Sequence, residues 1–290
     1  MMLSTSIEIL LNGLMLGALY ALFGLGLSLS LGVMRMINIA HGDLIVLGAY
    51  LSSVVMSSLG WSPLASLAIV LPAMFCIGWL LQVLLLNRVV GANPLAPLLL
   101  TFGLSIVLQN VMQQVFSGDT RSLDAGELGL RGLRLGSISI GVLPLLTTGL
   151  SLAIYAGTET LLAHSHWGRQ ARAVADDPAT ARLVGVSDRR LFALMTGFIL
   201  TIISLASVLY GMRTPFSPTA GPERLIFAFE AVVLGGLGNL WGTFAGGLVI
   251  GLTQVLGQQI DTGLGAFFGH LVFLGMLVAR PRGLFGRGAH

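Results

Sequence analysis

Charged side chains are scarce in this 290-residue sequence, and several hallmarks of soluble or secreted proteins are missing. Only 9% of residues are charged and 55% are hydrophobic, with a mean hydropathy of +0.90; a typical soluble domain has about 25% charged residues. There is no lysine, and the single cysteine, Cys76, excludes a disulfide framework and a cysteine-based metal site. The N-terminus carries Glu8 instead of the basic region of a cleaved signal peptide. Together these absences indicate an integral membrane protein.

The residue sets of hydrolytic and metal-dependent enzymes are also missing. No group of histidines and carboxylates with metal-ligand spacing surrounds His41, and no nucleophile–base motif is present. We therefore expect a protein that is not an enzyme and that holds no cofactor or metal. The basic balance, a formal net charge of +3, is expected to come from loop arginines that set membrane orientation, with no nucleic-acid partner.

Long apolar runs dominate the sequence, and about 20 apolar residues suffice to cross a bilayer. The 39 glycines are about twice the usual frequency, which favours closely packed and interrupted membrane helices. We predict an all-α, polytopic transmembrane helical bundle of about eight or nine membrane segments, some of them discontinuous, forming one domain over residues 1–290. A weak echo between Leu47–Ala49 and Leu234–Gly236 does not by itself establish an internal repeat. The expected spans are residues 9–31, 44–60, 62–86, 95–117, 141–163, 191–211 and 264–279, with a broken apolar region at 225–257.

The region 225–257 is too short for two ordinary crossings, and glycines interrupt it. Half-helices that meet near the midplane fit its length, and a region that enters and returns fits it as well. Asn239 follows the glycines Gly235 and Gly236, so we expect its side chain to satisfy backbone groups that the break leaves free.

A polar segment, residues 164–190, separates two of the apolar runs. Its five arginines predict that it lies on the cytoplasmic side. Asp177 can cap a helix that begins at Pro178 and ends at Gly185. Small residues recur at helical spacing from Ala171 to Gly185, which favours docking of another protein, although an ordinary basic loop accounts for the arginines equally well.

Arginine placement also predicts the orientation of the chain. The segment 164–190 and the tail residues Arg280, Arg282 and Arg287 are the strongest cytoplasmic signals. The loop 118–140 is rich in glycine and serine and balances its arginines with acids, so we expect it to be periplasmic. Alternation then places the N-terminus in the periplasm and the C-terminus in the cytoplasm.

Two groups of polar residues within or beside the spans are candidates for a transport pathway. The first is Asn38–Asp43, in which Gly42 permits a tight turn and Asp43 can cap the next helix, although a plain interfacial connection fits equally well. The second is Glu230, which either faces a pathway or caps a helix N-terminus at the headgroup level. For His270 the pattern favours a hydrogen-bonded packing residue over a proton relay.

Four motifs occur in order along nearly the whole chain: Asn12–Leu22, Met36–Tyr50, Trp167–Val186 and Ala231–Gly251. In order and spacing they resemble the branched-chain amino acid ABC transporter permeases, specifically the LivH-type inner-membrane subunit. Met36–Asp43 is similar to that family's signature of Asn, two residues and His-Gly-acid, with Asp43 where many members carry Glu.

This resemblance implies a multi-pass permease of the bacterial inner membrane that imports branched-chain amino acids or a related small polar solute by alternating access. The implied partners are a homologous second permease subunit, two cytoplasmic ABC ATPases that bind the ATP, and a periplasmic solute-binding protein. We expect ATPase coupling at Gly168, Arg169, Ala171, Arg172, Ala173, Asp176, Pro178, Ala181 and Gly185. We expect the translocation pathway or helix break at Asn38, His41, Gly42, Asp43, Glu230, Gly235, Gly236 and Asn239.

The sequence is also compatible with other functions. An ion-gradient-driven secondary transporter would transport without an ATPase, but the ionisable groups within the spans are few and scattered. A permease of the same family for urea or short amides would use the same machinery with another solute. A passive channel leaves the elaborate segment 164–190 unexplained, and an intramembrane enzyme built on His41 and Asp43 lacks a nucleophile–base set.

Overall fold

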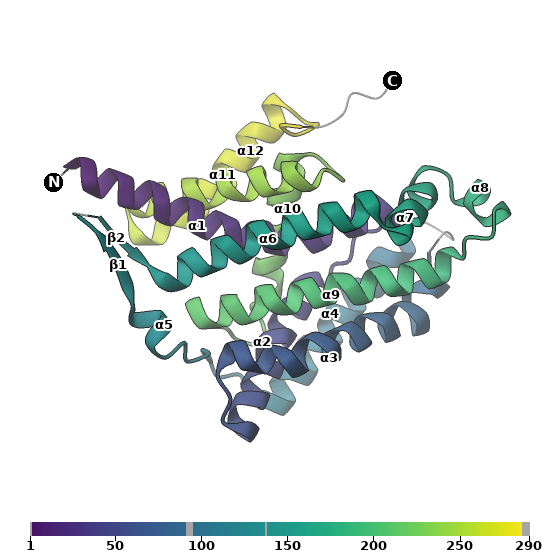
Figure 1. Ribbon diagram of the computed structural model, residues 1–290, viewed down its shortest axis with the longest axis horizontal. Helices are drawn as coiled ribbons and strands as arrows, with labels where there is room; N and C mark the ends of the chain where they lie inside the picture. Colours follow the sequence, from purple (N-terminus) through teal and green to yellow (C-terminus); the bar gives the residue numbers. More distant parts are fainter. Residues whose placement is uncertain (1, 91–94, 137, 286–290) are drawn as a thin grey trace.

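The computed structural model describes residues 2–90, 95–136 and 138–285, and twelve α-helices form most of this part of the chain (Figure 1). Eight of the described helices, the last together with the short turn before it, are long and apolar enough to cross a membrane. This confirms the all-α polytopic fold, with boundaries close to the expected ones. The eight helices are α1 (Met2–Leu29), α2 (His41–Leu59), α3 (Pro63–Leu84), α4 (Leu95–Phe116), α6 (Val142–His164), α9 (Asp188–Arg213), α11 (Leu240–Gln258) and α12 (Gly265–Ala279).

Shorter elements connect these spans. A small antiparallel hairpin, which the sequence pattern does not predict, forms at the end of the loop 118–140. Two of the short helices, α7 and α8, make up most of the segment 164–190. The short elements are α5 (Glu127–Leu130), β1 (Gly132–Leu135), β2 (Ile138–Gly141), α7 (His166–Asp176), α8 (Pro178–Leu183) and α10 (Gly221–Gly235).

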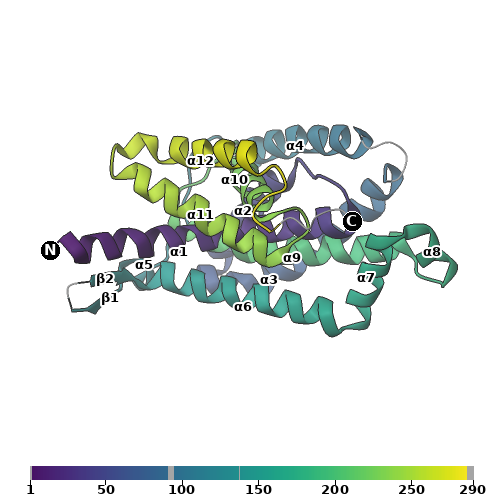
Figure 2. The same cartoon turned by 90° about the horizontal axis from the view of Figure 1, so that it is seen from above.

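The two ends of the molecule along its long axis carry different elements (Figures 1 and 2). The start of α1 and the hairpin lie together at one end, where the Glu8 carboxylate accepts a hydrogen bond from the Ser139 N–H at 2.7 Å. The helices α7 and α8 lie at the opposite end. The hairpin loop and the segment 164–190 therefore face opposite sides, as the arginine pattern predicts; which side is cytoplasmic stays a prediction.

The helices α1 and α11 pack antiparallel with their backbones in contact. Gly13 and Gly17 on α1 face Gly247 and Gly251 on α11, each pair four residues apart. A Cβ on Gly17 would lie 2.5 Å from the Leu248 Cα, and one on Gly251 would lie 2.1 Å from the Gly17 N. Small residues four apart allow this close packing in membranes, where dispersion contacts replace the hydrophobic effect. The packing buries most of α1 in the centre of the bundle.

The helices α1–α4 and α9–α12 are arranged as an inverted repeat. The most extensive contacts join α1 to α11 and α3 to α9. An irregular segment leads from α1 to α2 and another from α9 to α10, and α2 contacts α10. The outer helices α4 and α12 lie along one face of the molecule (Figure 2). The order α1–α4 therefore corresponds to α9–α12, an architecture common in transporters.

The interrupted region 225–257 contains most of α10, a tight turn and nearly all of α11. The turn lies at the far end of α1, where a Cβ on Gly32 would lie 3.3 Å from the Gly238 Cα. α10 has 15 residues, whereas α11 has 19 and is one of the candidate spans, so a short helix precedes a full-length one. The N-terminus of α10 meets that of α2 inside the bundle.

Candidate functional site

The chain turns back into the bundle between α1 and α2. α1 continues as a π-helix, η1 (Ser30–Met34), and Arg35 then adopts the left-handed conformation with φ of 51°. The Ser30 hydroxyl donates to the Met36 carbonyl at 2.9 Å. π-Helical turns and non-glycine residues with positive φ are uncommon, and both concentrate at functional sites.

Side chains satisfy the irregular backbone before α2. The Asn38 Oδ1 accepts from the Ala40 N–H at 3.0 Å, and the Ile39 N–H donates to the Thr101 hydroxyl of α4 at 3.1 Å. Non-helical backbone is tolerated at membrane depth only when its polar groups are bonded within the protein. Asn38 therefore shapes the turn that starts α2.

His41 anchors the start of α2 to α1. Its ring is buried, and the Nε2–H donates to the Phe23 carbonyl at 2.9 Å. The ring fills the space beside Gly26, where an added Cβ would lie 2.9 Å from the imidazole Cε1. A histidine at this position thus joins two helices through one hydrogen bond and one close packing contact.

Asp43 lies where the N-termini of α2 and α10 meet. The Ser105 hydroxyl of α4 donates to Oδ2 at 2.5 Å, and the Gln109 amide donates to the Ser105 hydroxyl at 3.1 Å. Oδ1 accepts no hydrogen bond from the described residues and lies against Gly221, the first residue of α10. Helix N-termini carry partial positive charge, so a carboxylate between two of them stabilises both.

Two glycines let these helix ends touch. A Cβ on Gly42 would lie 1.9 Å from the Gly221 carbonyl oxygen, and one on Gly221 would lie 2.8 Å from the Asp43 Cα. We refer to His41, Gly42, Asp43 and Gly221 as the α2–α10 junction. It joins the two halves of the inverted repeat, and it brings together three of the predicted pathway residues.

Glu230 stands apart from the junction, further along α10. Its side chain is buried, and Oε1 accepts from the Nδ1–H of His270 on α12 at 2.6 Å. Oε2 has no hydrogen-bond partner among the described residues. The His270 ring stacks on Phe227, which stacks on Tyr20 of α1. This buried site differs from a cap at the headgroup level, and His270 has the bonded packing role that the sequence favours.

The remaining predicted pathway residues form the turn between α10 and α11. Gly236 has a φ of 98°, and a Cβ on Gly235 would lie 2.1 Å from the Gly242 carbonyl carbon. The Asn239 Oδ1 accepts from the Gly242 N–H at 2.9 Å. Asn239 therefore caps α11 and, as expected, satisfies a backbone group that the break leaves free.

The segment 164–190 folds as two capped helices. The Ser165 hydroxyl accepts from the Gly168 N–H at 2.9 Å and caps α7. Asp177 caps α8, which begins at Pro178, and the hydroxyl and N–H of Thr180 hold the pKa of its carboxyl below the usual value. The predicted caps of this short helix are confirmed, although α8 ends at Leu183, two residues before Gly185.

Part of the small-residue face of this segment packs on its own chain. Gly168, Ala171 and Ala181 are buried within the described structure, and a Cβ on Gly168 would lie 2.0 Å from the Leu162 carbonyl oxygen. These residues hold α7 and α8 against the bundle, whereas Pro178 and Gly185 of the same face are exposed.

Two predicted coupling arginines bond the C-terminal end of α6. Arg169 donates to the His164 carbonyl at 3.2 Å, and Arg172 donates to the carbonyls of Leu162 and Ala163. Guanidinium groups at a helix C-terminus donate hydrogen bonds to free carbonyls, and their positive charge interacts favourably with the negative end of the helix dipole. The arginines thus orient α7 relative to α6, while Ala173, Asp176 and Pro178 remain exposed.

An apolar tip of α8, Leu183 and Val184, projects from the segment. These side chains are 87% and 74% exposed. The helix that they end, α8, lies at the opposite end of the molecule from the hairpin (Figure 1). Nothing in the sequence pattern singled them out, because two apolar residues in a polar segment look like ordinary packing residues.

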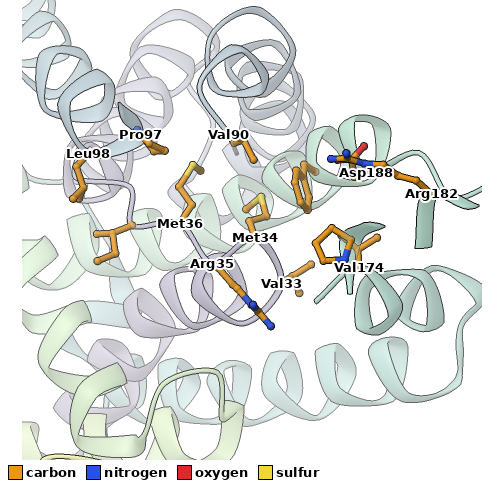
Figure 3. Close-up of a pocket in the computed structure, with 13 residues that line it drawn as sticks. Val33, Met34, Arg35, Met36, Val90, Pro97, Leu98, Val174, Arg182 and Asp188 are labelled. Carbon is orange, nitrogen blue, oxygen red and sulfur yellow. The ribbon is translucent and has the colours of Figure 1, made fainter. Parts of the chain in front are cut away.

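A cavity of about 570 Å³ lies between this segment and the turn into α2 (Figure 3). Its lining is mainly apolar and includes Val33, Met36, Val90 and Val174. At its edge Arg35 donates to the Ala175 carbonyl in the last turn of α7 at 2.7 Å, which links the segment to the chain entering the α2–α10 junction.

Several residues of the site were not expected from the sequence. Gly221 belongs to the junction, and Ser105 bonds Asp43 there. On α10, the Arg224 guanidinium carbon lies 4.9 Å from the Tyr210 ring centroid, and the guanidinium pairs with the Glu223 carboxylate at 2.7 Å. Pro222 right after Gly221 is a helix-start signal that would have located the beginning of α10. No pattern near Ser105 marks its contact, which depends on tertiary packing. Within the described residues, no cluster of His, Cys, Asp or Glu is able to hold a metal ion.

Comparison with known proteins identifies the family of the chain. Residues 9–279 match the branched-chain amino acid transport system permease component family. The chain is 28% identical over 296 residues to the high-affinity branched-chain amino acid transport system permease protein BraD of Pseudomonas aeruginosa, covering 96% of this chain and 95% of BraD. It is also 28% identical over 291 residues to the corresponding permease protein LivH of Escherichia coli strain K12, covering 95% and 94%.

A more distant relative is the probable branched-chain amino acid transport permease protein LivH of Methanocaldococcus jannaschii, 26% identical over 296 residues, which covers 92% of this chain and 89% of the relative. No solved structure matches the chain. The match to the family spans all eight candidate membrane helices and both groups of predicted site residues. The chain belongs to the family of permease components of branched-chain amino acid transport systems.

Proposed function

We propose that this chain is the membrane-spanning subunit of an ATP-binding-cassette importer that carries branched-chain amino acids into the cell. The family match over residues 9–279 is the observation that carries this proposal, because it covers the translocation helices and the segment 164–190 together. The chain itself is not an enzyme in this proposal. A homologous second permease subunit would complete the pathway, two cytoplasmic ATPases would hydrolyse ATP, and a periplasmic solute-binding protein would deliver the solute.

In this proposal the chain is one multi-pass domain of the inner membrane. The segment 164–190 would face the cytoplasm, since five arginines gather there, and the hairpin loop would face the periplasm. The N-terminus would then be periplasmic and the C-terminus cytoplasmic. The sides of the molecule on which α1 begins and α7 lies are compatible with this orientation.

The α2–α10 junction is our proposed moving part. Alternating access in inverted-repeat transporters is largely a rocking of one repeat against the other around a fixed site. The junction is the point where the two repeats meet, and backbone contacts at Gly42 and Gly221 would let small rotations change which side is open. Asp43 would hold the two helix ends together through its position between their positive dipoles.

For the coupling segment, we propose that Leu183 and Val184 enter an apolar groove on the ATPase. Both side chains are exposed, whereas Ala171 and Ala181 of the small-residue face are buried in this chain. Arg169 and Arg172 would act indirectly, by fixing α7 on α6, and exposed arginines such as Arg189 would surround the tip with positive charge. We therefore expect acidic residues around the groove of the partner.

A capture experiment from mildly solubilised membranes tests this proposal. The intact chain should recover an ATPase and a second permease subunit. The Leu183→Asp variant should no longer capture the ATPase but should still capture the second permease, because a charged side chain replaces the apolar one at the ATPase contact. Leu130→Asp is the matched control, since Leu130 is 91% exposed at the opposite end of the molecule. Capture of no ATPase by the unsubstituted chain would contradict the importer function.

A secondary transporter driven by an ion gradient remains the competing function. It predicts a chain that purifies without an ATPase and transports in vesicles without ATP. A permease of the same family for urea or short amides would give the same captured partners, and the solute retained by the captured binding protein would distinguish it from an amino acid importer.

A further inference from the structure

The chain after α12 folds back onto the end of α10. α12 ends at Ala279, and Arg280 precedes Pro281, which disfavours continued helix. The Gly283 N–H donates to the Arg280 carbonyl at 2.9 Å, which closes a β-turn with proline at its favoured second position. We refer to Arg280–Phe285 as the tail segment.

The tail segment bonds the last carbonyls of α10 through its backbone. The Leu284 N–H donates to the Leu234 carbonyl at 2.7 Å, and the Phe285 N–H donates to the Gly235 carbonyl at 3.3 Å. A helix leaves its last four carbonyls without partners from its own backbone. The tail segment thus supplies two of the donors that α10 lacks.

Close packing fixes the tail segment in place. Gly283 has a φ of 78°, and a Cβ added there would lie 2.5 Å from the Val233 carbonyl oxygen and 2.7 Å from the Gly236 N. Only glycine adopts this conformation at this distance without strain. Arg280 and Arg282 thus belong to a docked turn, whereas the sequence pattern explained them only as orientation signals; Arg287 lies outside the described residues.

We propose that the tail segment is a clamp that positions α10 for transport. One end of α10 forms the α2–α10 junction through Gly221, and the tail segment holds the other end at Leu234 and Gly235. The clamp ties α10 to α12. A rocking movement of α12 therefore moves α10, and with it the α2–α10 junction. This inference rests on the proposed importer function and adds a positioning element to it.

Two substitutions at one position separate the clamp from general effects on folding. Leu284→Pro removes the N–H that bonds the Leu234 carbonyl, because proline has no backbone donor. Leu284→Ala is the matched control, since it removes the side chain and keeps that donor. A second pair uses truncation: a chain ending at Phe285 keeps both tail donors, and a chain ending at Arg282 loses them.

The experiment uses the complete importer in proteoliposomes, with the amount of assembled complex measured for every variant. We measure leucine uptake and ATP hydrolysis in the same vesicles and express both per assembled complex. Leu284→Pro and the chain ending at Arg282 should hydrolyse ATP at near-normal rates and import about tenfold less leucine, within the usual range of coupling between sites. Leu284→Ala and the chain ending at Phe285 should match the unsubstituted importer.

Normal uptake per complex by Leu284→Pro would overturn the clamp. Uptake and hydrolysis that fall in the same proportion would also overturn it, because that pattern indicates a merely structural role. If Leu284→Pro does not assemble, the chain ending at Arg282 decides between the same outcomes. Failure of the importer function is distinguishable, since the unsubstituted chain would then show no ATP-dependent uptake.

Discussion

Replacing Gly42 by alanine tests the α2–α10 junction most sharply. The added Cβ would lie 1.9 Å from the Gly221 carbonyl oxygen and 2.9 Å from the Leu225 N, both backbone atoms of α10. Backbone cannot rotate away as a side chain does, so the two helix ends must separate by about 1 Å. Overpacking of this kind costs about 1–3 kcal/mol, and the backbone contacts place Gly42→Ala near the upper end.

The assay is thermal unfolding of the detergent-solubilised chain, followed by uptake in the reconstituted importer. A loss of about 3 kcal/mol corresponds to a fall in the unfolding midpoint of roughly 5–10 °C for a chain of this size. Leucine uptake per complex should fall as well, because the separated ends no longer move as one unit.

Gly103→Ala on α4 is the matched control for Gly42→Ala. No heavy atom lies within 4 Å of a Cβ added at Gly103. Alanine is the better helix former by about 1 kcal/mol, so this variant should be neutral or slightly more stable. An unchanged midpoint together with normal uptake for Gly42→Ala would refute the close contact at the junction.

Three further predictions follow from the packing and the segment 164–190. Gly251→Leu should prevent close packing of α11 on Gly17 of α1, so the amount of monodisperse protein in size-exclusion chromatography should fall steeply; recovery equal to that of the unsubstituted chain would contradict this packing. Arg169→Glu should break the hydrogen bond to the His164 carbonyl and place a negative charge beside the negative end of the α6 dipole. Leucine uptake should therefore fall while membrane insertion stays normal; full uptake would show that Arg169 does not contribute to coupling. The lowered pKa of Asp177 means that its cap stabilises α8 above the ordinary carboxyl pKa and is lost as pH falls through the lowered value, so protection of the Thr180 amide from hydrogen exchange should persist at the ordinary carboxyl pKa and drop only in more acidic solution; protection that is already lost at the ordinary carboxyl pKa would contradict the cap.

Local signals in the sequence were sufficient to predict most of the fold. Apolar runs of about 20 residues give membrane spans nearly independently of context, because hydrocarbon requires internally bonded helices. The caps at Asp177 and Pro178 were equally predictable, since capping depends on residues adjacent in the chain.

Contacts between distant segments could not be predicted in the same way. The inverted repeat depends on Gly42 and Gly221 meeting across 179 positions of the sequence, and the echo between residues 47–49 and 234–236 does not mark that contact. The hairpin at the end of the loop 118–140 was not predictable from the sequence pattern, because strands of four residues each are too short to show a clear alternation. The burial of Ala171 and Ala181 was not predictable, since a periodic small-residue face does not reveal whether it packs on its own chain or on a partner.

ATP dependence of leucine uptake by the reconstituted importer tests the central claim most directly. Vesicles would contain this chain, its captured permease and ATPase partners, and the binding protein outside, with ATP either inside or absent. Uptake that requires internal ATP and the binding protein, and that persists after ionophores collapse proton and sodium gradients, is the predicted result. Uptake that continues without ATP and stops with the ionophores would contradict the account and identify a secondary transporter.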